Sequence, residues 1–193
     1  MGVIRKIEEN NWTIAIWNTC ESLDELVQLS EKHDLSRIKS EKRKKEFLAS
    51  RLLLEKIHPN ASLVYNKYGA PTLSDGNFVS ISHSKNLVAI IVSDKKVGLD
   101  IEQISEKTLN LSSKFVEKDK YQKLTSEKAT LIWCCKEAIF KWHQKGGVDF
   151  KKDIYLTPFE LSEKGEIAAN YRNESLKLNY QKINNHYLVY VCK

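Results

Sequence analysis

Helix-like sequence precedes strand-like sequence twice along the chain, and this repeated order restricts the fold. Residues 40–57 contain neither Gly nor Pro and carry apolar side chains at helical spacing, which predicts a helix. Short β-rich runs separated by turn residues follow between 62 and 104 and predict three or four antiparallel strands. A second helical region, at 109–145, is again followed by strand-like runs, which extend to residue 192. The same architecture is therefore expected in both halves.

A further strand and helix are predicted near the N-terminus. Residues 12–17 are rich in aromatic and β-branched side chains, as strands are, and Ser22 and Glu25 have the spacing of a helix capping box. Together these segments predict an α+β protein of two similar lobes related by a pseudo-two-fold axis, each with helices packed on a small, mainly antiparallel sheet. We place the N-terminal lobe at residues 1–100 and the C-terminal lobe at residues 101–193.

The composition excludes several classes of protein. The 193 residues are 41% hydrophobic and include only seven Gly and three Pro, so collagen-like and disordered chains are excluded. No window approaches the roughly 20 apolar residues that cross a bilayer, and charges occupy the N-terminal stretch where a signal peptide would be apolar. We therefore expect a cytoplasmic protein with no membrane partner. The net charge of +6 favours an anionic partner without identifying it.

The four cysteines indicate neither a zinc site nor a disulfide framework. No pair has CxxC spacing and no His cluster lies nearby, so reduced thiols in the core are expected. The four are Cys20, Cys134, Cys135 and Cys192.

Two acidic residues alternate with apolar residues in the segment 97–102. Strand geometry sends Asp100 and Glu102 to one side of the sheet, and a hard cation such as Mg²⁺ would relieve their mutual repulsion. A solvent-exposed strand face explains the same pattern without a metal. On the second helical region, Glu137 and Lys141 stand one turn apart, so they either supply a third carboxylate and a cation or form an ordinary helix-stabilising pair.

Hydroxyl and imidazole groups end the strand predicted at 78–84. Ser82 and His83 lie at a turn, where their donors are suited to an anion such as phosphate; a histidine hydrogen-bonded within the turn is the structural alternative. A Ser-His hydrolase would also need an orienting carboxylate and usually a Gly-flanked nucleophile. A nucleophilic serine is therefore not expected.

Four sequence motifs occur in a specific order. They are Tyr68-Gly-Ala-Pro-Thr-Leu73, Phe78-Val-Ser-Ile-Ser-His-Ser84, Val97-Gly-Leu-Asp-Ile-Glu102 and Trp133-Cys-Cys-Lys-Glu-Ala-Ile-Phe-Lys141. In this order they resemble the 4′-phosphopantetheinyl transferases, most closely the monomeric, two-lobed branch that activates surfactin synthetase and similar enzymes. The resemblance implies Mg²⁺-dependent transfer of phosphopantetheine from coenzyme A to a serine of an acyl or peptidyl carrier protein, with release of adenosine 3′,5′-bisphosphate, at a site between the lobes.

The resemblance also implies roles for particular residues. Asp100, Glu102 and Glu137 would bind Mg²⁺, with the strand and the helix that carry them in different lobes, and Glu137, Lys141 and Lys136 would be catalytic. Coenzyme A would be bound by both lysines and by six further residues, namely Arg43, Arg51, Gly69, Pro71, Ser82 and His83. The implied partners are coenzyme A and an acidic carrier protein, without nucleic acid, and the implied state is a monomer.

Two positions depart from the family's pattern. Ala70 replaces the lysine that is usual in the Gly-Lys-Pro loop, so Lys67 or backbone groups would have to make that contact with coenzyme A. Cys134 replaces the usual Ser or Thr, which keeps the size but weakens hydrogen bonding. The three carboxylates are all present.

Two other functions are compatible with parts of the sequence. A Mg²⁺-dependent nuclease also needs clustered carboxylates and a lysine, but Glu102 is followed by Gln103 and Ile104 rather than by a lysine two residues on. A noncatalytic module that binds a carrier protein or nucleic acid is supported by the net charge and by the basic segment 37–45. A noncatalytic module of this kind would not account for the three carboxylates.

Overall fold

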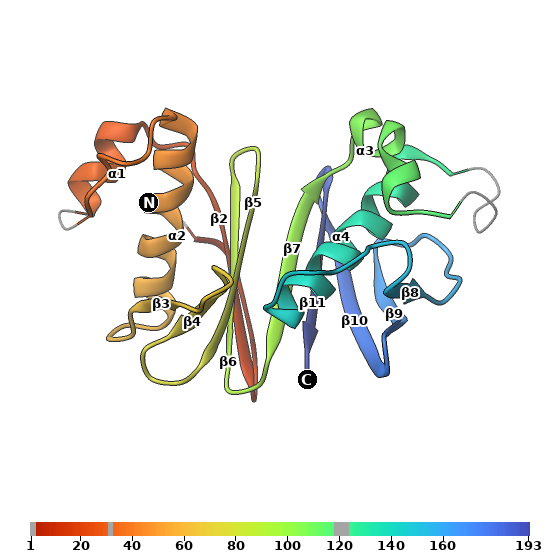
Figure 1. The fold of residues 1–193 in the computed structure, drawn as a ribbon. Coiled ribbons are helices and arrows are strands. Elements are labelled where there is room, and N and C mark those ends of the chain that lie inside the picture. Colours follow the sequence, from red (N-terminus) through yellow and green to blue (C-terminus); the bar gives the residue numbers. More distant parts are fainter. Residues whose placement is uncertain (1–2, 31–32, 118–123) are drawn as a thin grey trace.

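The computed structural model, which describes residues 3–30, 33–117 and 124–193, contains two antiparallel sheets with helices on their outer faces (Figure 1). The sheet of the N-terminal half has the strand order β1-β2-β6-β5-β4-β3. The sheet of the C-terminal half has the order β7-β11-β10-β9-β8. The predicted α+β fold with two lobes is therefore confirmed.

The elements have the following bounds. The first sheet contains β1 (Val3–Glu9), β2 (Trp12–Asn18), β3 (Leu63–Tyr65), β4 (Pro71–Leu73), β5 (Phe78–Ser84) and β6 (Leu87–Ser93). The second contains β7 (Val97–Gln103), β8 (Ile154–Leu156), β9 (Lys164–Tyr171), β10 (Glu174–Ile183) and β11 (His186–Cys192). The helices are α1 (Leu23–Leu29), α2 (Glu41–Ile57), α3 (Glu106–Asn110) and α4 (Ser126–His143), with a 3₁₀ turn at Ser112–Lys114.

Local capping explains where the N-terminal helices begin. Ser22 and Glu25 form the predicted capping box at the start of α1, and the hydroxyl of Ser40 accepts from the backbone amide of Arg43 at the start of α2. Helix α2 then buries a leucine-rich face, including Leu53, against the outer face of the first sheet. The helix predicted from residues 40–57 is thus confirmed.

The two sheets pack face to face through aliphatic side chains. Ile14 and Ile16 of β2 meet Leu99 and Ile101 of β7 and Leu188 of β11, and all five are almost fully buried. Because side chains alternate along a strand, burying Leu99 and Ile101 between the sheets turns the acidic residues of β7 to the opposite side. That opposite side faces α4.

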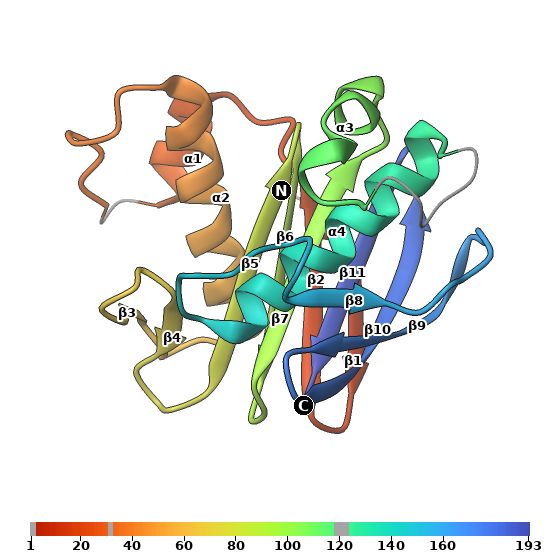
Figure 2. The ribbon, with the colours of Figure 1, turned by 45° about the vertical axis from the view of Figure 1, so that its right-hand side comes forward.

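Helix α4 packs directly onto β7, and Gly98 makes the close approach possible. A Cβ atom at Gly98 would lie 2.0 Å from the carbonyl oxygen of Ala138 and 2.5 Å from the backbone nitrogen of Trp142. Any side chain at this position would therefore push the helix away from the strand. Figure 2 shows α4 lying along β7 and β11, with β8 on its other side.

Three features of the fold differ from the sequence-based expectations. Strand β1 was not predicted, and the region 62–104 forms five strands rather than three or four. The predicted lobe boundary at residue 100 falls inside β7, all of which belongs to the second sheet. The chain passes from one sheet to the other in the turn between β6 and β7, because β7 pairs along its whole length with β11.

The longest helix, α4, has 18 residues and includes charged side chains such as Glu127, Lys136 and Lys141. In the described ranges, no helix has both the length and the apolar character needed to cross a membrane.

Candidate active site

The site is centred on Asp100, whose side chain is only 3% exposed. One carboxylate oxygen, Oδ1, accepts from the hydroxyl of Ser82 at 2.7 Å and from the ammonium group of Lys141 at 2.8 Å. The other oxygen, Oδ2, is buried and has no hydrogen-bond partner among the described residues. A buried carboxylate oxygen without a donor is costly, so this atom is a natural place for a positively charged ligand.

Glu102 stands two residues further along β7 and is half-buried. Its Oε1 accepts from the indole nitrogen of Trp133 at 3.1 Å, and its Oε2 accepts from the hydroxyl of Ser84 at 3.5 Å. Burial, helped by the nearby charge of Asp100, raises the pKa of Glu102 to about 7. The protein thus holds a carboxylate where its charged form is disfavoured.

Glu137 on α4 completes the acidic group. Burial and repulsion from Asp100 and Glu102 raise its pKa to about 7, although Lys141 one turn away favours the charged form. Asp100 is close enough to both glutamates to raise their pKa values, but no three acidic, His or Cys side chains in the described ranges already converge as a metal-binding group. All three lie on β7 and α4 of the C-terminal half, so the prediction that they come from different lobes was wrong.

The two lysines predicted to be catalytic lie in different places. Lys141 forms an ion pair with Asp100 and remains 26% exposed, so it lies at the edge of the site. Lys136 is buried in the core of the C-terminal lobe, where it donates to the carbonyl oxygens of Phe150 and Ile154. The structure therefore brings Lys141 to the carboxylates and does not bring Lys136 there.

A cavity of about 230 Å³ lies between the β3–β4 turn and the C-terminal part of α4. Gly69 and Pro71 line it together with Lys141 and Lys145. Three of these, Gly69, Pro71 and Lys141, were predicted to bind coenzyme A, and the structure brings them together. Asn66 shapes the turn, because its side chain accepts from the amides of Tyr68 and Ala70 and donates to the carbonyl of Gln144 at the end of α4. Gly69 has a φ of 81°, which a glycine adopts without strain.

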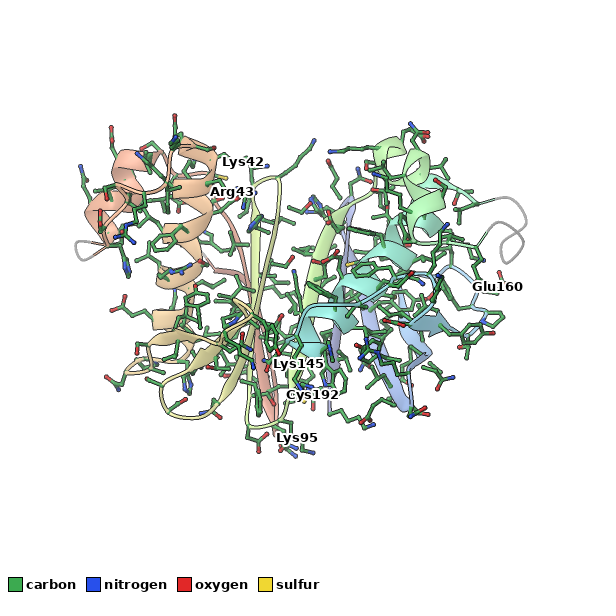
Figure 3. The ribbon with its side chains drawn as sticks, viewed as in Figure 1. Lys42, Arg43, Lys95, Lys145, Glu160 and Cys192 are labelled. Carbon is green, nitrogen blue, oxygen red and sulfur yellow. The ribbon has the colours of Figure 1, made fainter. Side chains whose placement is uncertain are left out.

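Ala70 stands where the family usually has a lysine, and a lysine other than the expected Lys67 lines the cavity beside it. Lys67, the substitute expected from the sequence, lies over the ring of Tyr68 at 5.1 Å. Lys145, two residues after the end of α4, lines the cavity instead and is labelled in Figure 3 in the lower half of the boundary between the lobes. A positively charged side chain from the segment just after α4 thus lies beside this loop.

His83 lies at the end of β5 beside the N-terminal half of α2. Its Nδ1 is 3.3 Å from Oε1 of Glu46, a buried carboxylate that also pairs with Lys42 at 3.6 Å. Partial burial lowers the pKa of His83; Glu46 acts in the opposite direction, and Lys141, Arg43 and Lys42 add to the lowering. Arg43 and Lys141 are therefore each within electrostatic reach of His83, and Figure 3 labels Lys42 and Arg43 at the upper end of α2.

Glu46 was not identified from the sequence as part of this group. A glutamate inside a charged helical stretch normally faces solvent, whereas Glu46 is only 8% exposed. The one hint in the sequence was that Glu46 directly precedes three apolar residues, Phe47, Leu48 and Ala49, of which Leu48 and Ala49 lie in the core.

Arg51 lies apart from His83. Its guanidinium group donates to the hydroxyls of Tyr65 at 2.6 Å and Ser50 at 2.9 Å and lies 3.7 Å from the centre of the Phe47 ring. It lines a separate groove of about 790 Å³ between α1, α2 and β3. The structure therefore does not place Arg51 with the other residues predicted to bind coenzyme A.

Ser82 also has a different surrounding from the one expected. Its hydroxyl is buried and faces β7, where it donates to Asp100 and accepts from the amide of Ile101 at 3.2 Å. The hydroxyl group therefore already uses its single donor, and one of its acceptor positions, within the protein.

Two family models match the chain. The model for the N-terminal domain of 4′-phosphopantetheinyl transferases matches residues 31–93. The model for the 4′-phosphopantetheinyl transferase superfamily matches residues 96–192, about half of the chain and the part that holds all three carboxylates. The first match ends with β6 and the second begins just before β7, where the chain changes sheets.

Three characterised proteins are similar to parts of the chain. It is 30% identical to 4′-phosphopantetheinyl transferase gsp of Aneurinibacillus migulanus over 111 residues, which are 52% of this chain and 47% of that protein. It is 36% identical to 4′-phosphopantetheinyl transferase psf-1 of Bacillus pumilus over 74 residues, 35% of this chain and 32% of that one. It is 30% identical to enterobactin synthase component D of Salmonella typhi over 121 residues, 56% of this chain and 52% of that one.

These alignments reach about half of each relative's length or less. The family models, in contrast, cover four strands of the first sheet, β3 to β6, together with the whole second sheet and the whole acidic group. The chain therefore belongs to the 4′-phosphopantetheinyl transferase superfamily.

Proposed function

We propose that this protein uses Mg²⁺ to transfer 4′-phosphopantetheine from coenzyme A to a serine of an acyl or peptidyl carrier protein, releasing adenosine 3′,5′-bisphosphate. The observation that carries the proposal is that Glu102 and Glu137 lie within electrostatic reach of Asp100, which has a buried oxygen without a donor and pairs with a lysine that lines a cavity. Carboxylates, a cation and room for a ligand are what phosphoryl transfer requires.

The residues present fit a magnesium ion. Oδ2 of Asp100 is buried without a hydrogen-bond partner. The pKa values of Glu102 and Glu137 are raised by burial and, in addition, by repulsion from Asp100, and a bound cation would favour the charged forms of all three carboxylates. Carboxylate oxygens are the protein ligands that Mg²⁺ prefers, and one or two of them usually suffice when phosphate oxygens complete the shell. When bound, Mg²⁺ supplies positive charge to the pyrophosphate oxygens of coenzyme A.

The protein's own groups then orient the reactants and receive the proton. The carrier serine attacks the β-phosphorus, the bond from that phosphorus to the bridging oxygen breaks, and the bisphosphate leaves. We assign Glu137 as the acceptor of the serine proton, because it is a half-buried carboxylate next to Asp100 and one helical turn from Lys141. Lys141 offsets negative charge on the pyrophosphate.

The remaining ligand contacts follow from the cavity and from the cations near His83. Gly69, Pro71 and Lys145 are suited to the adenine end of coenzyme A, because they line the cavity next to Lys141. His83 and Arg43 are suited to the 3′-phosphate, because they lie within electrostatic reach of each other and Lys141 lies within reach of His83. Lys136, Ser82 and Arg51 have internal partners and are left out of this assignment.

The partner and the setting are parts of the same proposal. The net charge of +6 favours encounter with an acidic carrier protein of fatty acid or secondary metabolite biosynthesis. All four cysteines are free, as is usual in the cytoplasm, where we place the reaction. We expect a monomer, which size-exclusion chromatography with light scattering tests.

The test is a transfer assay with the full chain. Coenzyme A, Mg²⁺ and an apo-carrier protein are incubated with it, and mass spectrometry measures whether the carrier gains one phosphopantetheine. Glu137→Gln should lower the rate by about two to four orders of magnitude. Glu127→Gln is the matched control, because Glu127 lies on the same helix but binds Lys182 and Tyr187.

The alternatives predict other outcomes in this assay. Cleavage of added DNA without a mass gain would favour a nuclease, and carrier binding without either reaction would favour a noncatalytic module. Full transfer by Glu137→Gln would remove Glu137 from its role as base.

A further inference from the structure

Strand β7 is held on both of its edges, but by different chemistry. On one edge it pairs with β11. On the other edge, the amides of Leu99, Ile101 and Gln103 donate to side-chain hydroxyls of β5, at 2.9, 3.2 and 2.9 Å. The acceptors are the alternate serines Ser80, Ser82 and Ser84, which we call the serine ladder. Hydroxyls of the first sheet thus satisfy backbone donors of the second.

The three hydroxyls differ in where they donate their own proton. Ser80 donates back to the carbonyl of Leu99, at 3.4 Å. Ser82 donates to Oδ1 of Asp100 at 2.7 Å, and Ser84 donates to Oε2 of Glu102 at 3.5 Å. The short bond to a charged acceptor belongs to Ser82 alone within the ladder, and such bonds are the strong ones. The ladder therefore combines one backbone contact with two contacts to the acidic group.

The bond from Ser82 fixes which oxygen of Asp100 remains available. Oδ1 is held from the β5 side by Ser82 and from α4 by Lys141, so the carboxylate cannot turn without losing both donors. Oδ2 is left buried and unpartnered. Ser82 itself is 5% exposed and accepts from Ile101, so its hydroxyl has a fixed orientation.

We propose that Ser82 is a positioning residue that acts through Asp100: its hydroxyl, supplied by the N-terminal lobe, presents Oδ2 of Asp100 to the metal bound by the C-terminal lobe. The inference rests on the proposed function for the identity of the metal. It replaces direct contact between Ser82 and coenzyme A by a role in metal affinity. Ser80, which makes the same backbone contact without touching a carboxylate, has no such role.

The experiment compares Ser82→Ala with Ser80→Ala in the full chain. Each variant leaves one β7 amide without its acceptor, so the two lose a similar amount of backbone hydrogen bonding. Mn²⁺, which takes the same oxygen ligands as Mg²⁺, is titrated and its free fraction measured by electron paramagnetic resonance. Ser82→Ala should weaken Mn²⁺ binding about tenfold or more, the usual effect of removing a residue that orients a metal ligand, while Ser80→Ala should bind as the unaltered protein does.

Two further variants keep the test decisive when Ser82→Ala folds poorly. Ser82→Thr keeps the hydroxyl and should restore Mn²⁺ affinity, whereas Ser82→Cys keeps the size with a weak donor and should not. Circular dichroism and thermal unfolding monitor the fold of each variant. In the transfer assay, Ser82→Ala should raise the Mg²⁺ concentration needed for half-maximal rate and leave the KM for coenzyme A unchanged.

The possible results separate this inference from the proposed function. Equal Mn²⁺ affinity in Ser82→Ala and the unaltered protein, or an equal loss in Ser80→Ala, would overturn the role of Ser82 even when transfer is observed. Absence of Mn²⁺ binding in the unaltered protein would overturn it as well. A selective loss in Ser82→Ala would support it even when no carrier protein is modified, and in that case the proposed reaction alone fails.

Discussion

The two inward-facing lysines of α4 meet opposite surroundings, although they are five residues apart. Lys136 is 5% exposed and donates to backbone carbonyls inside the C-terminal core. Lys141 is 26% exposed and pairs with the carboxylate of Asp100 at the edge of a cavity. A difference of five residues turns a side chain by about 140° around the helix axis, enough to separate a dry core from a ligand site.

The comparison shows that a charged side chain among apolar residues can have either a structural role or a role in binding a ligand. A buried ammonium group is stable where neutral carbonyls satisfy its protons, and it then links the helix to the loop and strand that carry Phe150 and Ile154. An ammonium group paired with a carboxylate that still has a free oxygen is available to a ligand. Two predictions test this contrast between the lysines, and two more test the other charged groups, beginning with the largest effect.

Lys141→Ala should reduce kcat/KM for phosphopantetheine transfer by about 10²-fold, because it removes one cation from the charge developing on the pyrophosphate. The variant should stay folded, since Lys141 lies at the edge of the site. Steady-state kinetics with a carrier protein, together with circular dichroism, measure the two quantities. A kcat/KM equal to that of the unaltered protein would contradict the assignment of Lys141.

Lys136→Met should act on stability instead. Methionine keeps the apolar stem but leaves the carbonyls of Phe150 and Ile154 without this donor, at a cost of about 2 kcal/mol in the free energy of unfolding. Urea unfolding measures this cost. Once folded, the variant should transfer phosphopantetheine at an undiminished rate, and a large loss of kcat with unchanged stability would restore Lys136 to the catalytic residues.

The acidic group should make the metal-free protein less stable at higher pH. Glu102 and Glu137 have pKa values of about 7 in the folded protein against ordinary values of 4.5, so their protonated forms stabilise the fold below pH 4.5 and this contribution is lost as the pH rises through 7. In EDTA at pH 8, Glu137→Gln should therefore raise Tm by about 2–4 °C, the shift that roughly 1 kcal/mol produces in a chain of this size.

At pH 4.5 the same substitution should leave Tm unchanged, because the carboxyl group it replaces is then mostly protonated. Mg²⁺ should raise Tm at pH 8 more in the unaltered protein than in Glu137→Gln. A variant that is less stable than the unaltered protein at every pH would argue that Glu137 has a structural role instead.

The smallest expected effect is that of salt. Because surface lysines and arginines attract an acidic carrier protein over a range that ions screen, kcat/KM should fall as NaCl rises while kcat changes little. Stopped-flow or steady-state kinetics at increasing NaCl measure the trend. A kcat/KM independent of salt would mean that electrostatic attraction does not guide the encounter.

Local patterns made much of the fold predictable from the sequence. The cap at Ser40, the absence of Gly and Pro in α2, and the aromatic and β-branched run of β2 each act within a few residues. Strand alternation also predicted that Asp100 and Glu102 share a face. Strand β1 was missed because Arg5, Lys6, Glu8 and Glu9 lie exposed on an edge strand, so its charged sequence lacks the pattern of a buried strand.

The missed parts of the site depend on contacts between distant segments. The direction of Lys136 is decided by carbonyls that follow α4 in the chain, and the direction of Ser82 by the unpaired edge of β7. Glu46 and His83 meet only once α2 lies against β5. Residue type and spacing identify such side chains as polar, but tertiary packing decides whether each one faces ligand or protein.

Gly98 limits how the arrangement of the acidic group can change by substitution. Gly98 has only a hydrogen atom where other residues have a side chain, and this allows β7 to lie close to α4, the helix that carries Glu137. Adding even one methyl group there would meet backbone atoms, which cannot move aside as a flexible side chain can. The distance between the two carboxylates on β7 and Glu137 on α4 therefore depends on a glycine outside the acidic group, and substitutions among the three acidic residues alone would not widen it.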